Sequence, residues 1–351
     1  MMLSASATFA DEFSPALPMP SRGLDEGMTM NRIALGSCFN QAGSGDIFTK
    51  VLEAEPDIFL FLGDNVYASD ESDDPELTSL KQAYGQLAGL DSFSALRQAM
   101  PVLTIWDDHD YGLNDAGGDW PRKYTAEALY EHVWNIGPDD PRSQREGVYF
   151  AHNIGPEGRR VQLIFLDTRF FRTTLTSNET DSVGPYQPSE DPGQSMLGND
   201  QWQWLQERLD EPAELRLIIS SIMVLSESHG WESWRMMPLE RQRLYNLLNS
   251  TEANGVIIVS GDTHAGAIYR SETTLDYPLV ELNTSSMNVP LSSFVKNPKQ
   301  VAGVHRLGDT FFEANYGLID IDWETGEISV QMRDKHSQSV RKHSINLSAL
   351  Q

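Results

Sequence analysis

Residues 57–67 read DIFLFLGDNVY. A nearly continuous apolar run of this length is typical of a β-strand that is buried on both faces. The run ends at Gly63, so Asp64 stands at the carboxyl end of the predicted strand. Binding sites of open α/β sheets form along that edge. The stretch therefore predicts a central strand of an α/β sheet that carries Asp64 into a site.

Short runs of the same apolar character recur along the chain, at residues 32–36, 102–106, 161–166, 215–224, 255–260 and 278–283. Helical spacing of apolar residues lies between several of them, at residues 47–55, 78–100, 125–134, 200–209 and 239–248. Strands that alternate with helices predict an α/β fold. Three final runs have no helix between them and predict a C-terminal antiparallel meander, at residues 316–323, 328–333 and 339–347. Residues 173–198 predict a long surface loop, a kind of segment that often forms a lid.

Polar residues of the kinds that bind metals follow five of the predicted strands. They are Cys38 after the first run, Asp64 after the second, residues 107–110 after the third, Asp167 with Arg169 after the fourth, and Asp262 with His264 after residues 255–260. The carboxyl ends of these strands are expected to meet at one edge. Such an edge predicts a metal centre with several carboxylates.

The sequence DDHD at residues 107–110 is the strongest of these signals. Three acidic side chains and a histidine within four residues would repel one another or stay protonated unless a cation lies nearby. Asp262 and His264 are two residues apart, so on an extended segment both side chains point to the same side and can share one ion.

The composition sets limits on function. The 351 residues are 40% hydrophobic and 22% charged, which is typical of a globular protein. No apolar run approaches the roughly 18 residues that a membrane-spanning helix needs. Twenty-six basic against 51 acidic residues give a net charge of −25, which argues against a nucleic acid as a stable partner. A bound metal could still attract a small anionic substrate.

The amino terminus suggests export. Residues 1–30 predict an extended leader, and residues 1–10, MMLSASATFA, resemble the cleavage end of a secretory signal without its basic segment and long apolar segment. The single cysteine, Cys38, cannot form an intrachain disulfide, so cysteine pairing does not indicate a compartment. We expect a periplasmic or secreted protein.

Several stretches, taken in order, resemble one known family. They are GSC at 36–38, GDNVY at 63–67, WDDHDYGLND at 106–115, LDTRFFR at 166–172 and SGDTH at 260–264. This series resembles the PhoD-like alkaline phosphatases and phosphodiesterases of the metallophosphoesterase superfamily, over roughly residues 31–335. The resemblance implies that residues 31–351 form one domain, a four-layer αββα sandwich. It also implies a ferric ion together with calcium.

The resemblance also assigns roles to individual residues. The implied metal ligands are Cys38, Asp64 and Tyr67 around iron, Asp108 and Asn114 near the second metal, and Asp262 and His264 closing the site. His109 corresponds to the group beside the leaving oxygen, and Arg169 to a guanidinium that could meet the phosphate. Asn65 stands where many members have an aromatic residue, and residues 232–238, ESWRMMP, lack the more usual Gly-Tyr before proline. We expect Asn65 and Trp231 to border the substrate.

The residue types are chemically consistent with this assignment. A thiolate and a phenolate suit a transition metal, whereas carboxylate and amide oxygens suit Ca²⁺ or Mg²⁺, so other divalent metals could also bind. Two metals can activate a water molecule as a bound hydroxide and stabilise both the attacking and the leaving oxygen. Asp64 would bridge the metals, and no protein nucleophile is needed.

The sequence leaves three other interpretations open. The same metals would serve a phosphodiesterase, including phospholipase D-like cleavage. A calcium-binding surface protein without turnover would need neither His109 nor the bridging Asp64. An iron redox protein would need an open iron site and no phosphate-directed Arg169. The interpretation that uses all these residues is metal-dependent hydrolysis of a small phosphate ester.

Overall fold

Every side chain of β2 (Ile58–Leu62) is buried in the computed structural model, as the continuous apolar run predicts. The structure describes residues 12–68, 74–180, 184–227, 229–251, 253–299 and 303–351. The strands β5 (Val161–Leu166), β6 (Leu215–Ser220) and β7 (Val256–Ser260) are equally enclosed. These strands lie at the centres of two sheets, where both of their faces are covered.

The first sheet has six strands. Its order is β12 (Ser339–Asn346), β11 (Glu327–Asp334), β10 (Asn315–Asp322), β1 (Arg32–Gly36), β2 and β3 (Val102–Ile105). The strands β1, β2 and β3 are parallel to one another, whereas β10 pairs antiparallel with β1 and begins the C-terminal meander. The predicted meander is therefore confirmed.

The second sheet is also mixed and has six strands. Its order is β4 (Phe150–Ile154), β5, β6, β7, β9 (Leu279–Asn283) and β8 (Ala267–Ser271). The four central strands are parallel, and the two edge strands are antiparallel to their neighbours.

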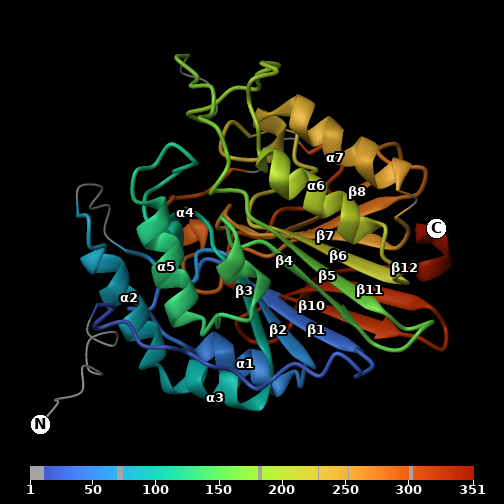
Figure 1. The fold of residues 1–351 in the computed structure, drawn as a ribbon. Coiled ribbons are helices and arrows are strands. Elements are labelled where there is room, and N and C mark those ends of the chain that lie inside the picture. The colour runs from blue at the N-terminus through green and yellow to red at the C-terminus, as the bar shows by residue number, and fades with distance from the viewer. Residues whose placement is uncertain (1–11, 69–73, 181–183, 228, 252, 300–302) are drawn as a thin grey trace, which may run out of the picture.

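Helices cover the outer faces of both sheets, which gives the four layers seen in Figure 1. The first sheet is covered by helices that include α1 (Asp46–Glu53) and α3 (Asp91–Ala99), and the second by α6 (Gly198–Leu209) and α7 (Pro238–Ser250). The other α-helices in the described part of the chain are α2 (Thr78–Ala88), α4 (Asp108–Tyr111) and α5 (Lys123–Val133). The predicted αββα sandwich is confirmed.

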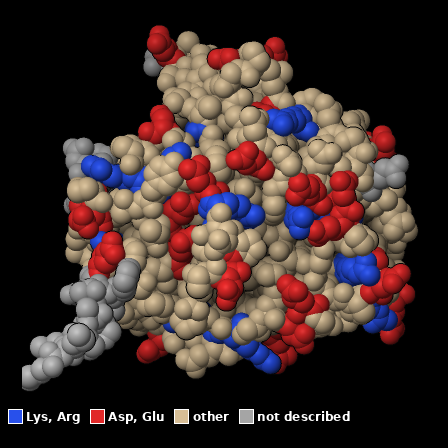
Figure 2. All heavy atoms as spheres, in the orientation of Figure 1, with Lys and Arg blue, Asp and Glu red and all other residues tan. Residues whose placement is uncertain are grey.

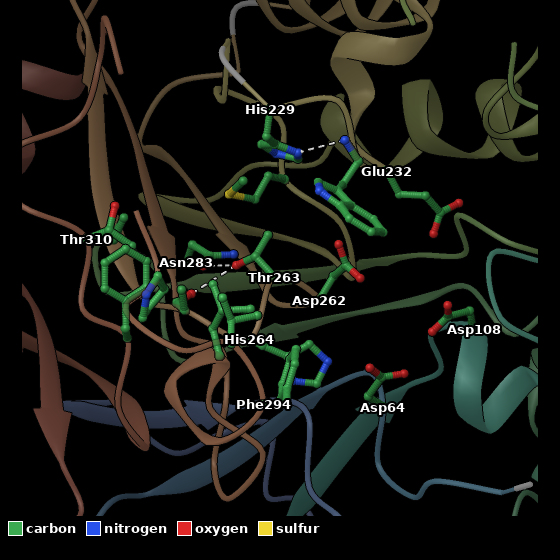
Figure 3. Close-up of a pocket in the computed structure, with 18 of the residues that line it drawn as sticks. Asp64, Asp108, His229, Glu232, Asp262, Thr263, His264, Asn283, Phe294 and Thr310 are labelled. Atoms are coloured by element: carbon green, nitrogen blue, oxygen red, sulfur yellow. Dashed lines mark hydrogen bonds between the residues drawn. The ribbon is translucent and has the colours of Figure 1, made fainter. Parts of the chain in front are cut away.

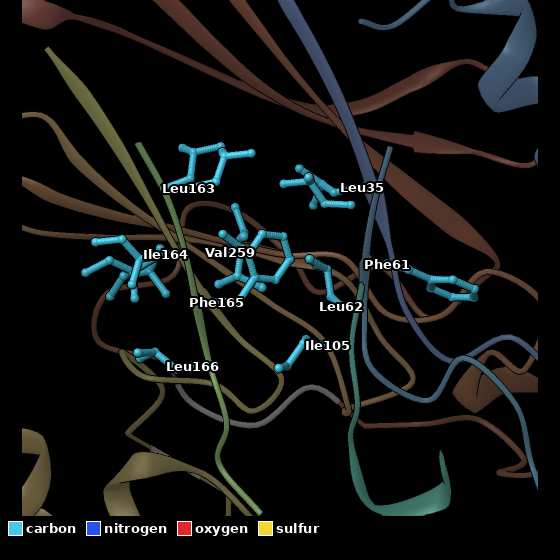
Figure 4. Packing of buried hydrophobic residues seen from close by; sticks show 14 of the residues in the cluster. Leu35, Phe61, Leu62, Ile105, Leu163, Ile164, Phe165, Leu166 and Val259 are labelled. Carbon is cyan, nitrogen blue, oxygen red and sulfur yellow. The ribbon is translucent and has the colours of Figure 1, made fainter. Parts of the chain in front are cut away.

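Alternate residues of the central strands pack in different layers. Leu35 and Leu62 of the first sheet lie on the side that faces Phe165 and Val259 of the second sheet, as Figure 4 shows. Phe61 points to the opposite face, where its ring lies 6.1 Å from that of Phe48 in α1 and equally far from Phe93 in α3. The core therefore continues through both sheets, and it holds the strand ends that bear the site in fixed positions.

Two predicted segments differ from the structure. Residues 78–100 form two helices, because Leu90 takes an extended conformation directly after Gly89. The predicted strand at 215–224 ends at Ser220, and residues 221–224 turn toward the site.

Of the predicted leader, residues 12–30 contain no helix or strand but pack on the domain, with Ala16, Met19 and Met30 buried. The signal-like residues 1–10 lie outside the described residues.

Acidic side chains are spread over the surface shown in Figure 2, with fewer lysines and arginines between them. None of the helices in the described parts of the chain is both long enough and apolar enough to span a membrane.

Candidate metal centre and substrate pocket

The candidate site lies where the two sheets join. Ser37, directly after β1, forms a parallel bridge with Ser285, which follows β9. Four of the predicted ligands follow the ends of β1, β2 and β7 and have left-handed backbones. They are Cys38 with φ 55°, Asp64 with φ 50°, Asp262 with φ 70° and His264 with φ 54°. Positive φ is uncommon for residues other than glycine and is concentrated at functional sites, where surrounding structure holds the strain.

Cys38, Asp64, Tyr67 and His264 form the first group. Candidate ligand atoms of Cys38, Asp64 and His264 lie within 4.8 Å of one another. The Tyr67 hydroxyl donates to Asp64 Oδ2 at 2.9 Å and lies 3.3 Å from His264 Nε2. His264 Nδ1 is 2.5 Å from the carbonyl oxygen of Val289, which fixes this nitrogen as the donor and leaves Nε2 with a lone pair on the side of the group.

A second group shares Asp64 and adds residues of α4. Ligand atoms of Asp64, Asp108 and His109 lie within 4.8 Å of one another. The His109 backbone N–H donates to Asp64 Oδ1 at 3.2 Å, and the His109 ring lies 4.4 Å from that of Tyr67. Asp108 Oδ2 accepts from the Asp115 backbone at 2.8 Å, while its Oδ1 is buried without a hydrogen bond.

Buried acids dominate the electrostatics of the site. Burial, reinforced by the neighbouring Asp108, raises the pKa of Asp64 to about 7. Burial and the Asp107 charge likewise raise the pKa of Asp262 well above its ordinary value. Burial opposes ionisation of Asp108 too, but nearby His109 and Arg169 hold its pKa below the ordinary value. Asp64 and Asp262 therefore hold protons more tightly than a free aspartate does, and a bound cation would replace those protons.

A third acidic group includes two residues that the sequence analysis did not select. Ligand atoms of Asp108, Asp115 and Glu232 lie within 4.8 Å of one another. Asp115 directly follows the predicted ligand Asn114, which was a local signal for it. Glu232 comes from a loop far along the chain, and only the fold brings it to Asp108. Tyr186, in the predicted lid segment, donates its hydroxyl to Asp115 Oδ2 at 2.6 Å.

The structure places Arg169 away from the pocket wall. Its side chain is fully buried, and it pairs with Asp107 and, through Nη1 at 2.6 Å, with Glu232 Oε2. Arg172 lies beside it and pairs with Glu232 Oε1 at 2.9 Å. Its guanidinium is enclosed by these carboxylates and does not belong to the cavity lining, so its contact with a phosphate stays a prediction.

Asn65 is also turned away from the pocket. Its side-chain Nδ2 donates to the Ile105 carbonyl at 2.8 Å and to Asp110 Oδ2 at 2.5 Å, and the residue is fully buried. Its side chain links the end of β3 to α4, and its contact with a substrate stays a prediction.

A cavity of about 580 Å³ opens over the acidic groups. The predicted residues in its lining are Asp64, Asp108, His109, Asn114, Trp231, Asp262 and His264. Figure 3 shows Asp64, Asp108 and Asp262 pointing toward one another on one side of the cavity, with Thr310 on the opposite side. Trp231 is 57% exposed and belongs to the lining, and its contact with a substrate stays a prediction. Cys38 and Tyr67 are not in this lining; they contact Asp64 behind it.

The comparisons with known proteins agree on one family. The model of the PhoD-like phosphatases matches residues 33–332. Alkaline phosphatase D of Bacillus subtilis (strain 168) is 24% identical over 238 residues, which are 61% of this chain and 40% of that protein, so the matched region spans less than half of the curated relative.

A solved structure of PhoD has the same fold. It superposes with a TM-score of 0.70 and 17% identity, and the alignment covers 95% of this chain and 73% of that one. The family model spans most of the chain, and its matched range includes every residue of the three acidic groups and of the cavity lining. The chain belongs to the PhoD-like phosphatase family.

Proposed function

We propose that this protein hydrolyses phosphate esters with the help of metal ions bound at the junction of the two sheets. The observation that carries the proposal is the shared position of Asp64, whose carboxylate belongs both to the group with Cys38 and His264 and to the group with Asp108 and His109. A carboxylate between two sets of ligands is suited to bridge two metals.

The residues fit a pair of metals by three observations. Asp108 Oδ1 is buried without a hydrogen-bond partner, which suits an oxygen that binds a metal. His264 presents Nε2 to the group because Nδ1 is occupied by the Val289 carbonyl. The donors also differ in type, since sulfur, phenol and imidazole lie on one side of Asp64 and carboxylates on the other.

The two sets therefore favour different metals. Cys38, Asp64, Tyr67 and His264 would hold a transition metal such as ferric iron. Asp64, Asp108, Asn114 and Asp262 would hold calcium or another divalent ion. Such metals supply Lewis acidity and an activated water for attack on phosphorus.

The protein's own groups position the substrate and assist the leaving oxygen. His109 lines the cavity beside Asp108 and packs against Tyr67, so its ring is oriented before substrate enters. We assign to it the hydrogen bond or proton that the leaving oxygen requires. Arg169 acts indirectly, because its ion pairs hold Asp107, the residue before Asp108, and Glu232 in place.

Two related activities remain alternatives to monoester hydrolysis. Diester cleavage, including phospholipase D-like cleavage, would use the same residues. A calcium-binding protein without turnover would keep Asp108 and Asp262 but gain nothing from His109.

We also propose that the protein acts outside the cytoplasm, which fractionation of the native cells would test by locating its activity.

The experiment measures hydrolysis of p-nitrophenyl phosphate and bis(p-nitrophenyl) phosphate, with added Ca²⁺ and after chelation, alongside iron and calcium content. We expect turnover that chelation abolishes and that Ca²⁺ together with iron restores, and the ratio of the two rates ranks monoester against diester. The variant Asp64→Asn should lose both turnover and metal, while Asp46→Asn, an exposed aspartate of α1, should keep both. No turnover of either ester by metal-loaded protein would overturn the proposal.

A further inference from the structure

The part of the cavity beyond the acidic groups is lined mainly by apolar side chains. They are Met223, Trp231, Leu291, Phe294, Val295 and Phe312. Phe294 is 58% exposed and Val295 38% exposed, so with Trp231 three large apolar residues meet solvent at the mouth of one cavity. Exposed apolar surface gathered in a concave site marks a place that a ligand covers.

The segment that carries Phe294 is fastened to the candidate metal centre. The Leu291 backbone N–H donates to the His264 carbonyl at 2.7 Å, and the Ser292 N–H donates to the Phe312 carbonyl at 3.2 Å. The Phe294 ring lies 5.3 Å from the His264 ring, edge to face at 89°. These contacts hold Phe294 at a fixed distance from His264, one of the residues proposed to bind the metals (Figure 3).

Few of the polar side chains in this outer part carry a charge. Thr263 donates its hydroxyl to Asn283 Oδ1 at 3.0 Å, and Asn283 Nδ2 donates to the Gly261 carbonyl at 2.8 Å, so both are engaged within the protein. Burial lowers the pKa of His229 to about 4, which leaves this histidine neutral at neutral pH, and its Nε2 is buried without a hydrogen-bond partner. Lys299 is the one lysine or arginine among the described lining residues.

We propose that the preferred substrates are phosphate esters whose organic group is bulky and apolar, with that group packed against Phe294 and its neighbours. The inference rests on the proposed function, because it takes the phosphate to lie at the metals that the acidic groups would bind. A small or strongly polar organic group would leave the exposed rings in water and gain none of the energy of covering them.

The test compares three primary alkyl phosphates: ethyl phosphate, 2-phenylethyl phosphate and 2-carboxyethyl phosphate. Release of inorganic phosphate gives kcat/KM for each. We expect 2-phenylethyl phosphate to exceed ethyl phosphate by about tenfold or more, mainly through KM, since an apolar pocket discriminates by this order for added hydrocarbon. In Phe294→Ala the ratio should fall to about threefold or less. Tyr124→Ala, which removes an aromatic ring of similar exposure outside the cavity, should keep the wild-type ratio.

A second measurement separates this inference from the proposed function. Calorimetry would compare binding of 2-phenylethylphosphonate with ethylphosphonate, neither of which can be hydrolysed. Tighter binding of the phenylethyl compound that Phe294→Ala abolishes supports the apolar wall even if no ester turns over. Equal kcat/KM for the phenylethyl and ethyl esters overturns the inference while leaving the hydrolase proposal intact. A preference for the carboxylated ester also overturns it, and would assign the outer cavity to an anion held by Lys299.

Discussion

Arg169 is a predicted substrate-binding residue that the structure places outside the cavity lining. Its guanidinium is fully buried between Asp107 and Glu232, so a variant that keeps the bulk but loses the charge, Arg169→Met, would leave the buried Asp107 without its ion-pair partner and Glu232 with Arg172 alone. We expect the free energy of unfolding to fall by about 3–5 kcal/mol. Urea unfolding would measure this, with the exposed Arg159→Met as the control. A large rise in KM with unchanged stability would instead indicate that Arg169 reaches the substrate.

Glu127 gives a prediction for pH. Burial raises its pKa to about 7 from an ordinary 4.5, although the Gly147 N–H donates to it at 2.5 Å. The folded state therefore holds this proton more tightly than the unfolded state, so its contribution to stability is present below pH 4.5 and is lost as pH rises toward 7. Glu127→Gln removes the dependence.

Thermal melts between pH 4 and pH 8 would check the effect of Glu127→Gln. The melting temperature of the variant, relative to wild type, should rise from about pH 4.5 to about pH 7 and then stay level. The exposed Glu207→Gln should follow wild type throughout. A constant difference between Glu127→Gln and wild type across this range would contradict the prediction.

The sequence could identify those site residues that directly follow a strand. Asp64 and Asp262 each come one or two residues after an apolar run, so strand prediction was enough to bring them to one edge. Glu232 lies on a loop without a regular pattern, and only the packing of that loop against Arg169 and Arg172 places it beside Asp108. Side-chain direction was equally out of reach for Asn65, because its turn toward Asp110 depends on where α4 begins.

At the scale of elements, the carboxylate of Asp110 in α4 forms the hydrogen bonds that join α4 to the residues after β2. Asp110 Oδ1 accepts from the backbone N–H groups of Asp64 and Asp107, at 3.1 and 2.6 Å, and its Oδ2 accepts from Asn65. Replacing it in Asp110→Asn puts an amide N–H₂ opposite N–H donors. We expect a loss of about 2–4 kcal/mol in stability.

The same variant should also lose metal, since Asp64 and Asp108 are both positioned by this connection. Denaturant unfolding and metal analysis of Asp110→Asn would be compared with Asp91→Asn, an exposed position at the start of α3. Full stability together with full metal content would show that the connection does not depend on Asp110.

Edge elements explain most of what the sequence analysis missed in the fold. The strands β4 and β8 lie at the two edges of the second sheet, and β4 reads FAHNI, in which the three middle residues are only partly buried. A strand of this kind lacks the continuous apolar run that marked the central strands. The break between α2 and α3 also has only a weak local signal. Gly89 ends α2 here, but a single glycine does not always end a helix.

For the whole molecule, the number of sheets could not be derived from periodicity alone. Central strands of both sheets are buried on both faces and read alike, so their sequences do not say which strands pair. The four-layer architecture followed from the resemblance to the PhoD-like family, and the structure confirms it. The candidate ligands come from both sheets: Cys38 and Asp64 follow strands of the first, and Asp262 and His264 follow β7 of the second.

Metals bound at this junction would link the two sheets and stabilise the folded state. A ligand that binds only the folded protein contributes about 2.7 kcal/mol when its concentration is 100 times its dissociation constant. We therefore expect chelation to lower the melting temperature by roughly 5 °C and added Ca²⁺ with iron to restore it. Asp64→Asn should melt near the chelated wild type and respond little to chelator, because its sites are already impaired. If the wild type loses its metals by analysis but melts at an unchanged temperature, the metals do not hold the sheets together, and the packing of Leu35 and Leu62 against Phe165 and Val259 does so alone.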